Sequence, residues 1–329
     1  MPADEFDIIK NLFAPLAGEG ARDLVDDVAL LGDLIVTTDA IVEGVHFLAD
    51  DPVGSVAKKA LRVNLSDIAA KGAKPVGALL TLIWPQQRPS TQIADFARAL
   101  AEDLLTFNVP LLGGDTTSTP GPLTISITAF GKPLGASTPS RSDAKPGDHL
   151  WVTGVIGDAY LGLLSLTATP EIVGASASEQ MDAHALAVRA AYRTPSPPMS
   201  FAGAIAAFAR ASMDVSDGLV TDAGKLASAS GVAIRIDAEA VPLSAAGHAH
   251  LGKTGTDGLI AMITGGDDYQ ALFTAAPEAR GAIMQAARES GTNVSLIGDV
   301  FAGAGVRVVG AGGVELRIPH AGHSHRLGR

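Results

Sequence analysis

The first half of the chain alternates short apolar runs with longer amphipathic stretches. Near the start, Phe6, Ile9 and Phe13 recur at helical spacing, so residues 5–17 are predicted to form a helix that packs on the protein through its apolar side. Further along, apolar runs of strand length are separated by helical patterns. The predicted strands span residues 34–38, 76–84, 110–112 and 123–131, and the predicted helices span residues 55–71 and 90–107.

The second half repeats this mixture after residues 135–148, which are rich in Ser, Pro, Gly and charge and are predicted to connect two domains. The Ala- and Ser-rich residues 167–180 are predicted to form a mobile surface loop. At roughly 150 residues per domain, we expect an α/β (α+β) protein with domains at residues 1–136 and 137–329. The predicted strands here are 150–153, 232–236, 260–264, 270–274 and 306–309, and the predicted helices are 183–191 and 201–211.

Composition narrows the possible functions. The apolar runs are far shorter than the ~20 residues of a membrane-spanning helix, and the N-terminus lacks the basic and apolar regions of a secretion signal. We therefore expect a cytoplasmic protein. The net charge of -11 argues against nucleic acid and membranes as partners. The absence of cysteine excludes thiolate metal sites, so any metal is held by oxygen or imidazole.

Aspartates recur where an apolar run meets a turn of Gly, Ser or Thr. Magnesium takes oxygen ligands, and glycines beside them let backbone N–H groups approach phosphate oxygens. Any one of these aspartates is more simply explained as a helix cap or turn former. Together they predict a metal and phosphate site if the turns converge, because clustered carboxylates repel one another unless cations bind. The aspartates are Asp26, Asp27, Asp39, Asp67, Asp115, Asp214, Asp217, Asp267 and Asp268.

Two other patterns carry less weight. Residues 247–254 match the phosphate-binding pattern G-x-x-x-x-G-K-[ST], but no apolar strand precedes them and no helical pattern follows, which disfavours a P-loop. The tail histidines His320, His323 and His325 suggest a metal site, although a solvated terminus explains them more simply. The sequence contains no dinucleotide-binding fingerprint after a strand and no hydrolase nucleophile motif.

Several motifs in a fixed order make the sequence recognisable. They are Asp26-Asp27, Thr37-Thr38-Asp39, and residues 42–47, 64–73, 113–116, 141–148 and 214–218. In order and spacing, over nearly the full length, they resemble those of the thiamine-monophosphate kinases, a family of the aminoimidazole ribonucleotide synthetase-like superfamily. The resemblance implies an N-terminal mixed-sheet domain that forms a homodimer and binds ATP near the dimer interface, followed by a C-terminal α/β domain. It also implies phosphorylation of thiamine monophosphate to thiamine diphosphate by ATP and Mg²⁺.

The same resemblance assigns roles to individual residues. It implies no acid or base catalyst; Asp39, Asp115 and Arg141 act through metal binding and charge. The implied ATP contacts are Gly114, Asp115, Arg141 and Ser216. The implied substrate contacts are His46, Asp267 and His323. The implied Mg²⁺ ligands are Asp27, Thr37, Thr38, Asp39, Asp67, Asp115, Asp214 and Asp217.

The chemistry agrees with this residue set. The acceptor phosphate is already ionised near neutral pH, because its second pKa is ~6, so a general base is not required. The barrier lies in bringing two polyanions into line, which calls for positioning and for charge neutralisation by metal ions. We therefore expect direct in-line transfer of the γ-phosphoryl group without a phosphoenzyme.

The sequence departs from the family pattern in three places. Residues 23–25 stand where Gly-Ile-Gly is usual before the aspartate pair, and this leaves the backbone less permissive. Asp267 stands where Glu is common, and His323 stands where an aromatic residue is expected to stack on the substrate. Two alternatives stay open: an enzyme of the purine-synthesis branch, and a non-catalytic ATP-binding regulatory module. The absence of cysteine excludes the selenophosphate-forming and hydrogenase-maturation branches.

Overall fold

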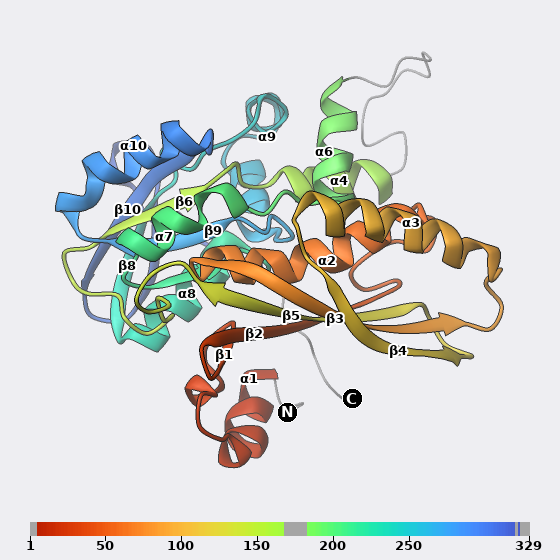
Figure 1. The fold of residues 1–329 in the computed structure, drawn as a ribbon. Coiled ribbons are helices and arrows are strands. Elements are labelled where there is room, and N and C mark those ends of the chain that lie inside the picture. Colours follow the sequence, from red (N-terminus) through yellow and green to blue (C-terminus); the bar gives the residue numbers. More distant parts are fainter. Residues whose placement is uncertain (1–4, 168–182, 320–321, 323–329) are drawn as a thin grey trace.

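The N-terminal part of the chain forms a mixed five-stranded sheet. The computed structural model describes residues 5–167, 183–319 and 322. The strands lie in the order β1-β2-β5-β3-β4, with β3 and β4 parallel and the other pairs antiparallel. Their bounds are β1 Ala29–Leu31, β2 Leu34–Val42, β3 Ala73–Pro85, β4 Leu111–Thr119 and β5 Thr124–Pro133. Helices α2 (Val53–Ala70) and α3 (Thr91–Thr106) cover one face of this sheet (Figure 1).

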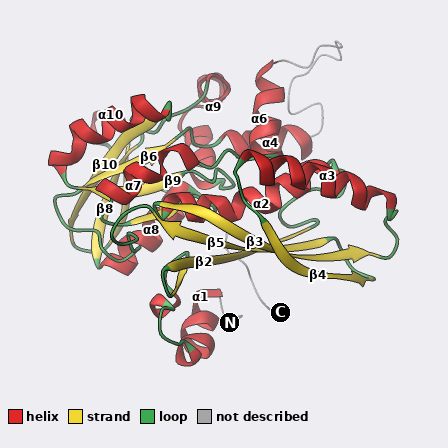
Figure 2. Cartoon of the chain, in the orientation of Figure 1, coloured by secondary structure: helices red, strands yellow, loops and turns green. Residues whose placement is uncertain are grey.

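The C-terminal part forms a six-stranded sheet in the order β11-β8-β10-β6-β9-β7, in which only the β11–β8 pair is parallel. The strands are β6 His149–Thr153, β7 Ser212–Asp214, β8 Val232–Asp237, β9 Ala271–Ala275, β10 Val294–Ala302 and β11 Gly305–Val309. The helices are α4 Asp158–Thr167, α6 Ala183–Arg193, α7 Ala202–Phe208, α8 Leu219–Ser230, α9 Ala245–Thr264 and α10 Arg280–Ser290. Figure 2 shows the helices flanking both sheets.

Alternation along the central strands explains why helices cover both faces of the second sheet. On β6, Trp151 packs in one core with residues of α7 and α10, whereas its neighbours Leu150 and Val152 face the core formed with α4, α8 and α9. Strands that are apolar on both sides are typical of sheets covered on both faces. The predicted two-domain α/β fold with a mixed N-terminal sheet is confirmed; the second sheet is mixed as well, which was not predicted.

Helix α2 is the structural link between the two sheets. Nearly every side chain from Val56 to Lys71 is buried, because one side packs on the N-terminal sheet and the other on β7, β9 and α7. A helix buried all round carries its polar groups into the protein interior. Here these include Lys59, Asn64 and Asp67, and each makes a hydrogen bond or ion pair.

Some sequence predictions were wrong in detail. Residues 260–264 are the last turn of α9 and not a strand. Residues 247–254 lie inside the same helix, which is incompatible with a P-loop. Strand β2 runs beyond the predicted residues 34–38 and includes Asp39. Gly113–Asp115, expected as a turn after the strand at residues 110–112, lie within strand β4. The strands β1, β7 and β10 and the helices α4, α8, α9 and α10 were not predicted.

The N-terminal segment differs from the expected packed helix. It forms α1 (Glu5–Ile8), a π-turn (Ile9–Phe13) and a 3₁₀ turn (Ala14–Leu16). Leu12, Phe13 and Leu16 are 62%, 52% and 80% exposed, so this segment does not bury its apolar side within the chain. The predicted loop at 167–180 falls, apart from Thr167 at the end of α4, outside the described residues. Within the described part, no helix is long and apolar enough to cross a membrane.

Candidate active site

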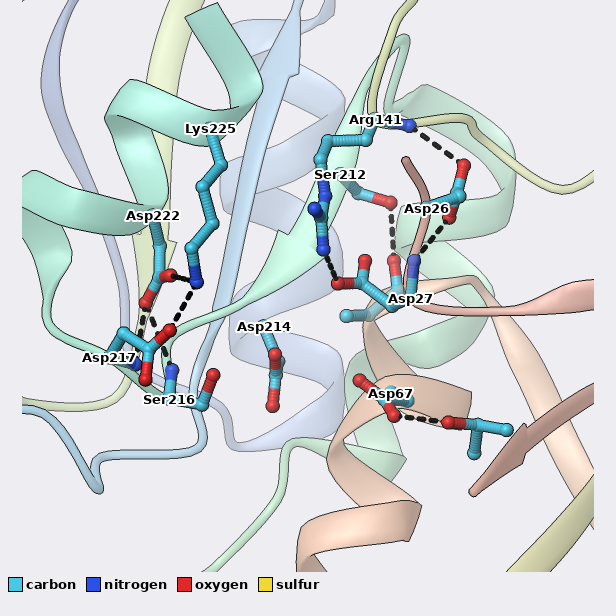
Figure 3. Close-up of polar contacts among 12 residues, drawn as sticks. Asp26, Asp27, Asp67, Arg141, Ser212, Asp214, Ser216, Asp217, Asp222 and Lys225 are labelled. Atoms are coloured by element: carbon cyan, nitrogen blue, oxygen red, sulfur yellow. Dashed lines mark hydrogen bonds and ion pairs between the residues drawn. The ribbon is translucent and has the colours of Figure 1, made fainter. Parts of the chain in front are cut away.

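Three aspartates from distant parts of the chain meet between the two domains. Carboxylate oxygens of Asp27, Asp67 and Asp214 all lie within 4.8 Å of one another. Asp27 precedes β1, Asp67 belongs to α2 and Asp214 ends β7 (Figure 3). Such a set of oxygen atoms suits a hard divalent cation such as Mg²⁺.

A fourth aspartate lies beside them on the helix-covered face of the N-terminal sheet. The backbone N–H of Asp39 donates a hydrogen bond to Asn64 of α2 (3.0 Å), which fixes this part of β2 against the helix. Two residues earlier, on the same face, Thr37 donates to Asp67 (2.5 Å). We refer to Asp27, Asp39, Asp67 and Asp214 as the carboxylate cluster.

Burial and mutual repulsion make the carboxylate cluster unfavourable without cations. Burial, with the charges of Asp27 and Asp217, raises the pKa of Asp39 to about 6. Burial and neighbouring carboxylates raise the pKa of Asp67 and of Asp214 well above the usual range, although each accepts a hydrogen bond from Thr37 or Ser66. Groups held partly protonated in this way become fully ionised when a metal ion binds.

The aspartate pair at the edge of the cluster is matched by basic side chains. Lys71, at the end of α2, is fully buried and lies 2.7 Å from Asp26 and 2.8 Å from Asp27. Arg141 forms an ion pair with Asp27, and its backbone N–H donates to Asp26 (3.1 Å). Although burial acts in the opposite direction, these cations hold the pKa of both aspartates below the usual range.

A second acidic group lies on the far side of Asp214, at the start of α8 (Figure 3). Asp222 is fully buried and accepts hydrogen bonds from the backbone N–H groups of Ser216 and Asp217, both at 3.0 Å. Lys225 forms ion pairs with Asp217 and with Asp222, the latter at 2.7 Å. The turn that carries Ser216 and Asp217 is therefore fixed by one buried carboxylate and one lysine.

The structure does not bring the predicted residues Asp115, Thr38 and Gly114 to the carboxylate cluster. In the sheet register, Asp115 of β4 lies beside Thr81 of β3, which lies beside Ser126 of β5, which lies beside Ala40 of β2. This row of residues is on the exposed face of the sheet, whereas Asp39 is on the face covered by helices. Strand β4 lies three strands from β2, or about 14 Å at ~4.8 Å per strand. Thr38 shares the exposed face and bonds to β5 (Ile127 O, 3.2 Å) rather than to Asp39.

Gly114 accompanies Asp115 on this outer strand. Its φ is +151°, and a Cβ there would lie 1.8 Å from the carbonyl oxygen of Leu80. Only glycine fits this position, and the exposed backbone around it is open to a ligand.

Two of the predicted substrate residues lie around Lys59 of α2. Asp267 belongs to a turn that packs on the Ser216 turn, where its backbone N–H donates to Ser216 O (2.8 Å). Its carboxylate pairs with Lys59 (2.6 Å), and the same lysine donates to the carbonyl of His46 (2.9 Å). The structure thus brings Asp267 and His46 together, whereas His323 lies outside the described residues.

Sequence reasoning missed the basic residues and the capping carboxylate of the site. Lys71 follows Asp67 by one helical turn, and Lys225 follows Asp222 by three residues, spacings that place each pair on one helix face. This signal was available, but the same spacing occurs on many solvent-exposed helices. Nothing local indicated that Lys59 pairs with a residue more than two hundred positions away.

Comparisons with known proteins agree with the fold. The family described as "AIR synthase related protein, N-terminal domain" matches residues 25–132, and its C-terminal domain matches residues 145–311. A thiamine-monophosphate kinase from Caulobacter vibrioides is 43% identical over 93% of this chain and 86% of the relative. One from Salmonella typhimurium is 35% identical over 92% of each. The solved structure of AaThiL complexed with AMPPCP and TMP is 29% identical, with a TM-score of 0.82 over 98% of this chain and 97% of that one.

These matches first define the class: a two-domain protein of the AIR synthase-related fold with a carboxylate-lined site between its domains. Within that class, identity over more than nine-tenths of the chain decides the family. The chain belongs to the thiamine-monophosphate kinase family.

Proposed function

We propose that this protein transfers the γ-phosphoryl group of ATP to thiamine monophosphate and so produces thiamine diphosphate. The observation that carries the proposal is the convergence of Asp27, Asp67 and Asp214, in a chain of the thiamine-monophosphate kinase family. Its location in the cytoplasm stays a prediction from the sequence.

The residues at the site fit Mg²⁺. The carboxylate cluster offers only oxygen atoms as ligands, which suits Mg²⁺. The raised pKa values of its aspartates show that ionising these buried, mutually repelling carboxylates is unfavourable, and a bound cation would remove this penalty. Asp27, Asp39, Asp67 and Asp214 would hold the ions, with Thr37 and Asp217 at their margin. Bound Mg²⁺ supplies charge neutralisation for the phosphates.

Arg141 is placed to bind a phosphate. Its side chain is mostly buried, and its Nε has no hydrogen-bond partner among the described residues, although the guanidinium is ion-paired with Asp27. A buried donor without an acceptor is costly, and a phosphate oxygen would satisfy it. The backbone around Ser216, fixed by Asp222, would offer a second contact to the nucleotide.

The transfer itself requires little from the protein beyond positioning. The acceptor phosphate is ionised near neutral pH, so no residue has to remove a proton. Arg141 would orient the donor phosphate, and the turn with Asp267 would orient the acceptor. Direct in-line transfer predicts inversion at a chiral γ-phosphate and no covalent phosphoprotein.

A homodimer explains why Asp115 lies away from the cluster. Strand β1 pairs only with residues 34–36 of β2, which leaves the rest of that edge open, and β4 forms the opposite open edge. Open edges favour pairing with another strand. A second copy that sets its β4 beside β2 would bring its Asp115 near Asp39. Leu111 and Leu112 of β4 are 48% and 61% exposed in the single chain, which supports burial in an interface.

A coupled assay of ADP release tests the activity. With ATP and Mg²⁺, the purified protein should release ADP only when thiamine monophosphate is added, and thiamine diphosphate should form in equal amount. Nucleotide binding without substrate-dependent release would contradict the proposal and favour a regulatory ATP-binding module. Release that depends on a purine-pathway substrate would favour the purine-synthesis branch.

Mixed dimers test the partner arrangement. Asp39→Asn and Asp115→Asn homodimers should each be nearly inactive. After subunit exchange, a mixed dimer would contain one intact site if Asp115 acts across the interface, so a fraction of wild-type turnover should return. If both residues acted within one chain, exchange would restore no activity.

A further inference from the structure

One buried ammonium group joins three segments at the interface between the two domains. Lys59 of α2 is 1% exposed. Its Nζ lies 2.6 Å from Asp267 Oδ2, 2.9 Å from the carbonyl oxygen of His46, and 4.1 Å from the centre of the Tyr192 ring in α6. The lysine therefore contacts the loop after β2, the end of α6 and the turn before β9.

The surroundings of this ammonium group match its chemistry. A buried lysine is tolerated only if its charge is compensated and its donors are used. Here the Asp267 carboxylate neutralises the charge and accepts one hydrogen bond, and the His46 carbonyl accepts a second. On its third side, the ammonium group lies over the face of the Tyr192 ring in a cation–π contact. Because all three directions are occupied, the side chain has a single orientation.

The partner of Lys59 is held by its backbone as well. Asp267 has φ of +68° and follows Gly266 at +76°, a conformation that few residues other than glycine adopt. A Cβ on Gly266 would lie 2.5 Å from the carbonyl oxygen of Ser216, so the turn is pressed against the Ser216 turn. The Asp267 side chain remains 25% exposed, and one of its oxygens pairs with Lys59. The carboxylate is thus fixed in direction and accessible from one side.

We propose that Lys59 is a positioning residue for substrate binding: it orients the Asp267 carboxylate toward the organic part of the phosphate acceptor. This rests on the proposed contact between Asp267 and that acceptor. The side chain of Asp267 is one methylene shorter than that of glutamate, so its carboxylate reaches only a short distance from the backbone. The orientation of the carboxylate therefore decides which hydrogen-bond donor of the acceptor it can contact. The contacts of Lys59 are with His46, Asp267 and Tyr192 and not with the carboxylate cluster, so its effect should be specific to the acceptor.

Steady-state kinetics of Lys59→Met test the proposal. The KM for thiamine monophosphate should rise about 10- to 100-fold, which corresponds to one misplaced hydrogen-bonding contact, whereas the KM for ATP should stay within about twofold. Isothermal titration with thiamine monophosphate alone should show the same weakening. Lys59→Arg should fall between the two proteins, because its planar fork does not reproduce three diverging contacts.

Controls separate positioning from general stability. Lys58→Met removes the neighbouring lysine, which pairs with Glu102 (2.7 Å) on the outside of α2, and should change neither KM. If Lys59→Met does not fold, Lys59→Arg carries the test, because it keeps the positive charge beside Asp267: its KM for thiamine monophosphate should be raised and its KM for ATP unchanged. Unchanged acceptor affinity in a folded Lys59 variant, or an equal rise in both KM values, would overturn the proposal. A wild-type protein without turnover of thiamine monophosphate would instead contradict the proposed function.

Discussion

Two parts of the domain interface differ in how buried charge is compensated. In the part around Lys59, three basic side chains each pair with a carboxylate: Lys59 with Asp267, Arg62 with Asp103, and Arg193 with Asp51. In the carboxylate cluster, the acidic side chains outnumber the basic ones around them, and the pKa values of Asp39, Asp67 and Asp214 are raised by burial and repulsion.

This difference distinguishes a part that fixes geometry from a part that suits the binding of cations. Ion pairs that are complete within the chain hold the domains in register, since breaking one leaves a buried charge uncompensated. The excess of carboxylates in the cluster has the opposite effect and destabilises the metal-free protein. Variants in the two parts should therefore have different consequences.

The largest expected effect is loss of turnover at the carboxylate cluster. Asp39→Asn should lower kcat by at least ~100-fold, because a charged ligand for the metal ions is lost. The same variant should unfold at a higher temperature than the wild type in EDTA, because one repelling charge is gone. Calorimetry and the coupled assay check both results. Asp33→Asn, on an exposed turn beside the same sheet, is the matched control and should change neither; wild-type turnover in Asp39→Asn would refute its assignment.

Substitution of Arg62, which pairs with Asp103, should lower the stability of the protein without selectively weakening the binding of ATP or thiamine monophosphate. Arg62 makes two hydrogen bonds to Asp103, at 2.5 and 3.0 Å, and others to the carbonyls of Thr194 and Pro195. Arg62→Met should lower the free energy of unfolding by about 3 kcal/mol, because Asp103 is left buried and unpaired. Denaturant titration measures this. The double variant Arg62→Met/Asp103→Leu should recover most of the loss; no recovery would mean that the pair does not account for the effect.

The stability of the metal-free protein should depend on pH, because two buried aspartates at the site have raised pKa values. The pKa of Asp39 and of Asp222 is raised to about 6 from 3.8. Between these values the native state holds protons that the unfolded chain has released, so stability in EDTA should fall as pH rises from about 4 to about 6. Saturating Mg²⁺ should remove the part of this fall that comes from Asp39, since bound cations keep the carboxylates of the cluster ionised. The part from Asp222, which pairs with Lys225, should remain. Thermal unfolding at pH 4.5 and pH 6.5 measures it, and a melting temperature that rises in EDTA over this window would contradict the account.

The smallest expected effect comes from the strained segment before the aspartate pair. Arg22, Asp23 and Leu24 have φ values of 50°, 55° and 55°, in the left-handed region that L-residues avoid. Leu24→Gly should therefore raise the free energy of unfolding by about 1 kcal/mol, as measured in denaturant. Leu24→Ala keeps the Cβ and should give no such gain. Equal effects of the two substitutions would show that backbone strain is not the cause.

The strain in this segment also shows what the sequence could predict. The motif with Asp26 and Asp27 was identified, and the missing glycines at residues 23 and 25 were expected to leave the backbone less permissive. Asp23, with φ of 55°, agrees with that expectation, whereas Val25, with φ of -112°, has a conformation that needs no glycine. Likewise, Asn64 and Asp67 were placed on a helix, and that helix carries both into the interior. Short motifs on one element are predictable because their geometry is local.

Features that depend on distant pairing could not be predicted. Asp115 was grouped with Asp39, but the sheet register places them on opposite faces and three strands apart. Lys59 gives no local signal, and the helical spacing of Lys71 from Asp67 and of Lys225 from Asp222 is a weak one, because a lysine on a helix is usually solvated. Only tertiary packing decides which lysine meets a buried carboxylate. The longer helices of the second domain, such as α9, were missed where glycines interrupt the apolar pattern.

Diffraction from crystals grown with Mn²⁺ and a non-hydrolysable ATP analogue tests the central claim most directly, because Mn²⁺ binds the same oxygen ligands as Mg²⁺ and gives an anomalous signal. The account predicts anomalous peaks among the carboxylates of Asp27, Asp39, Asp67 and Asp214, with the analogue's phosphates in contact with them. Bound nucleotide with no metal peak among these four side chains would contradict it.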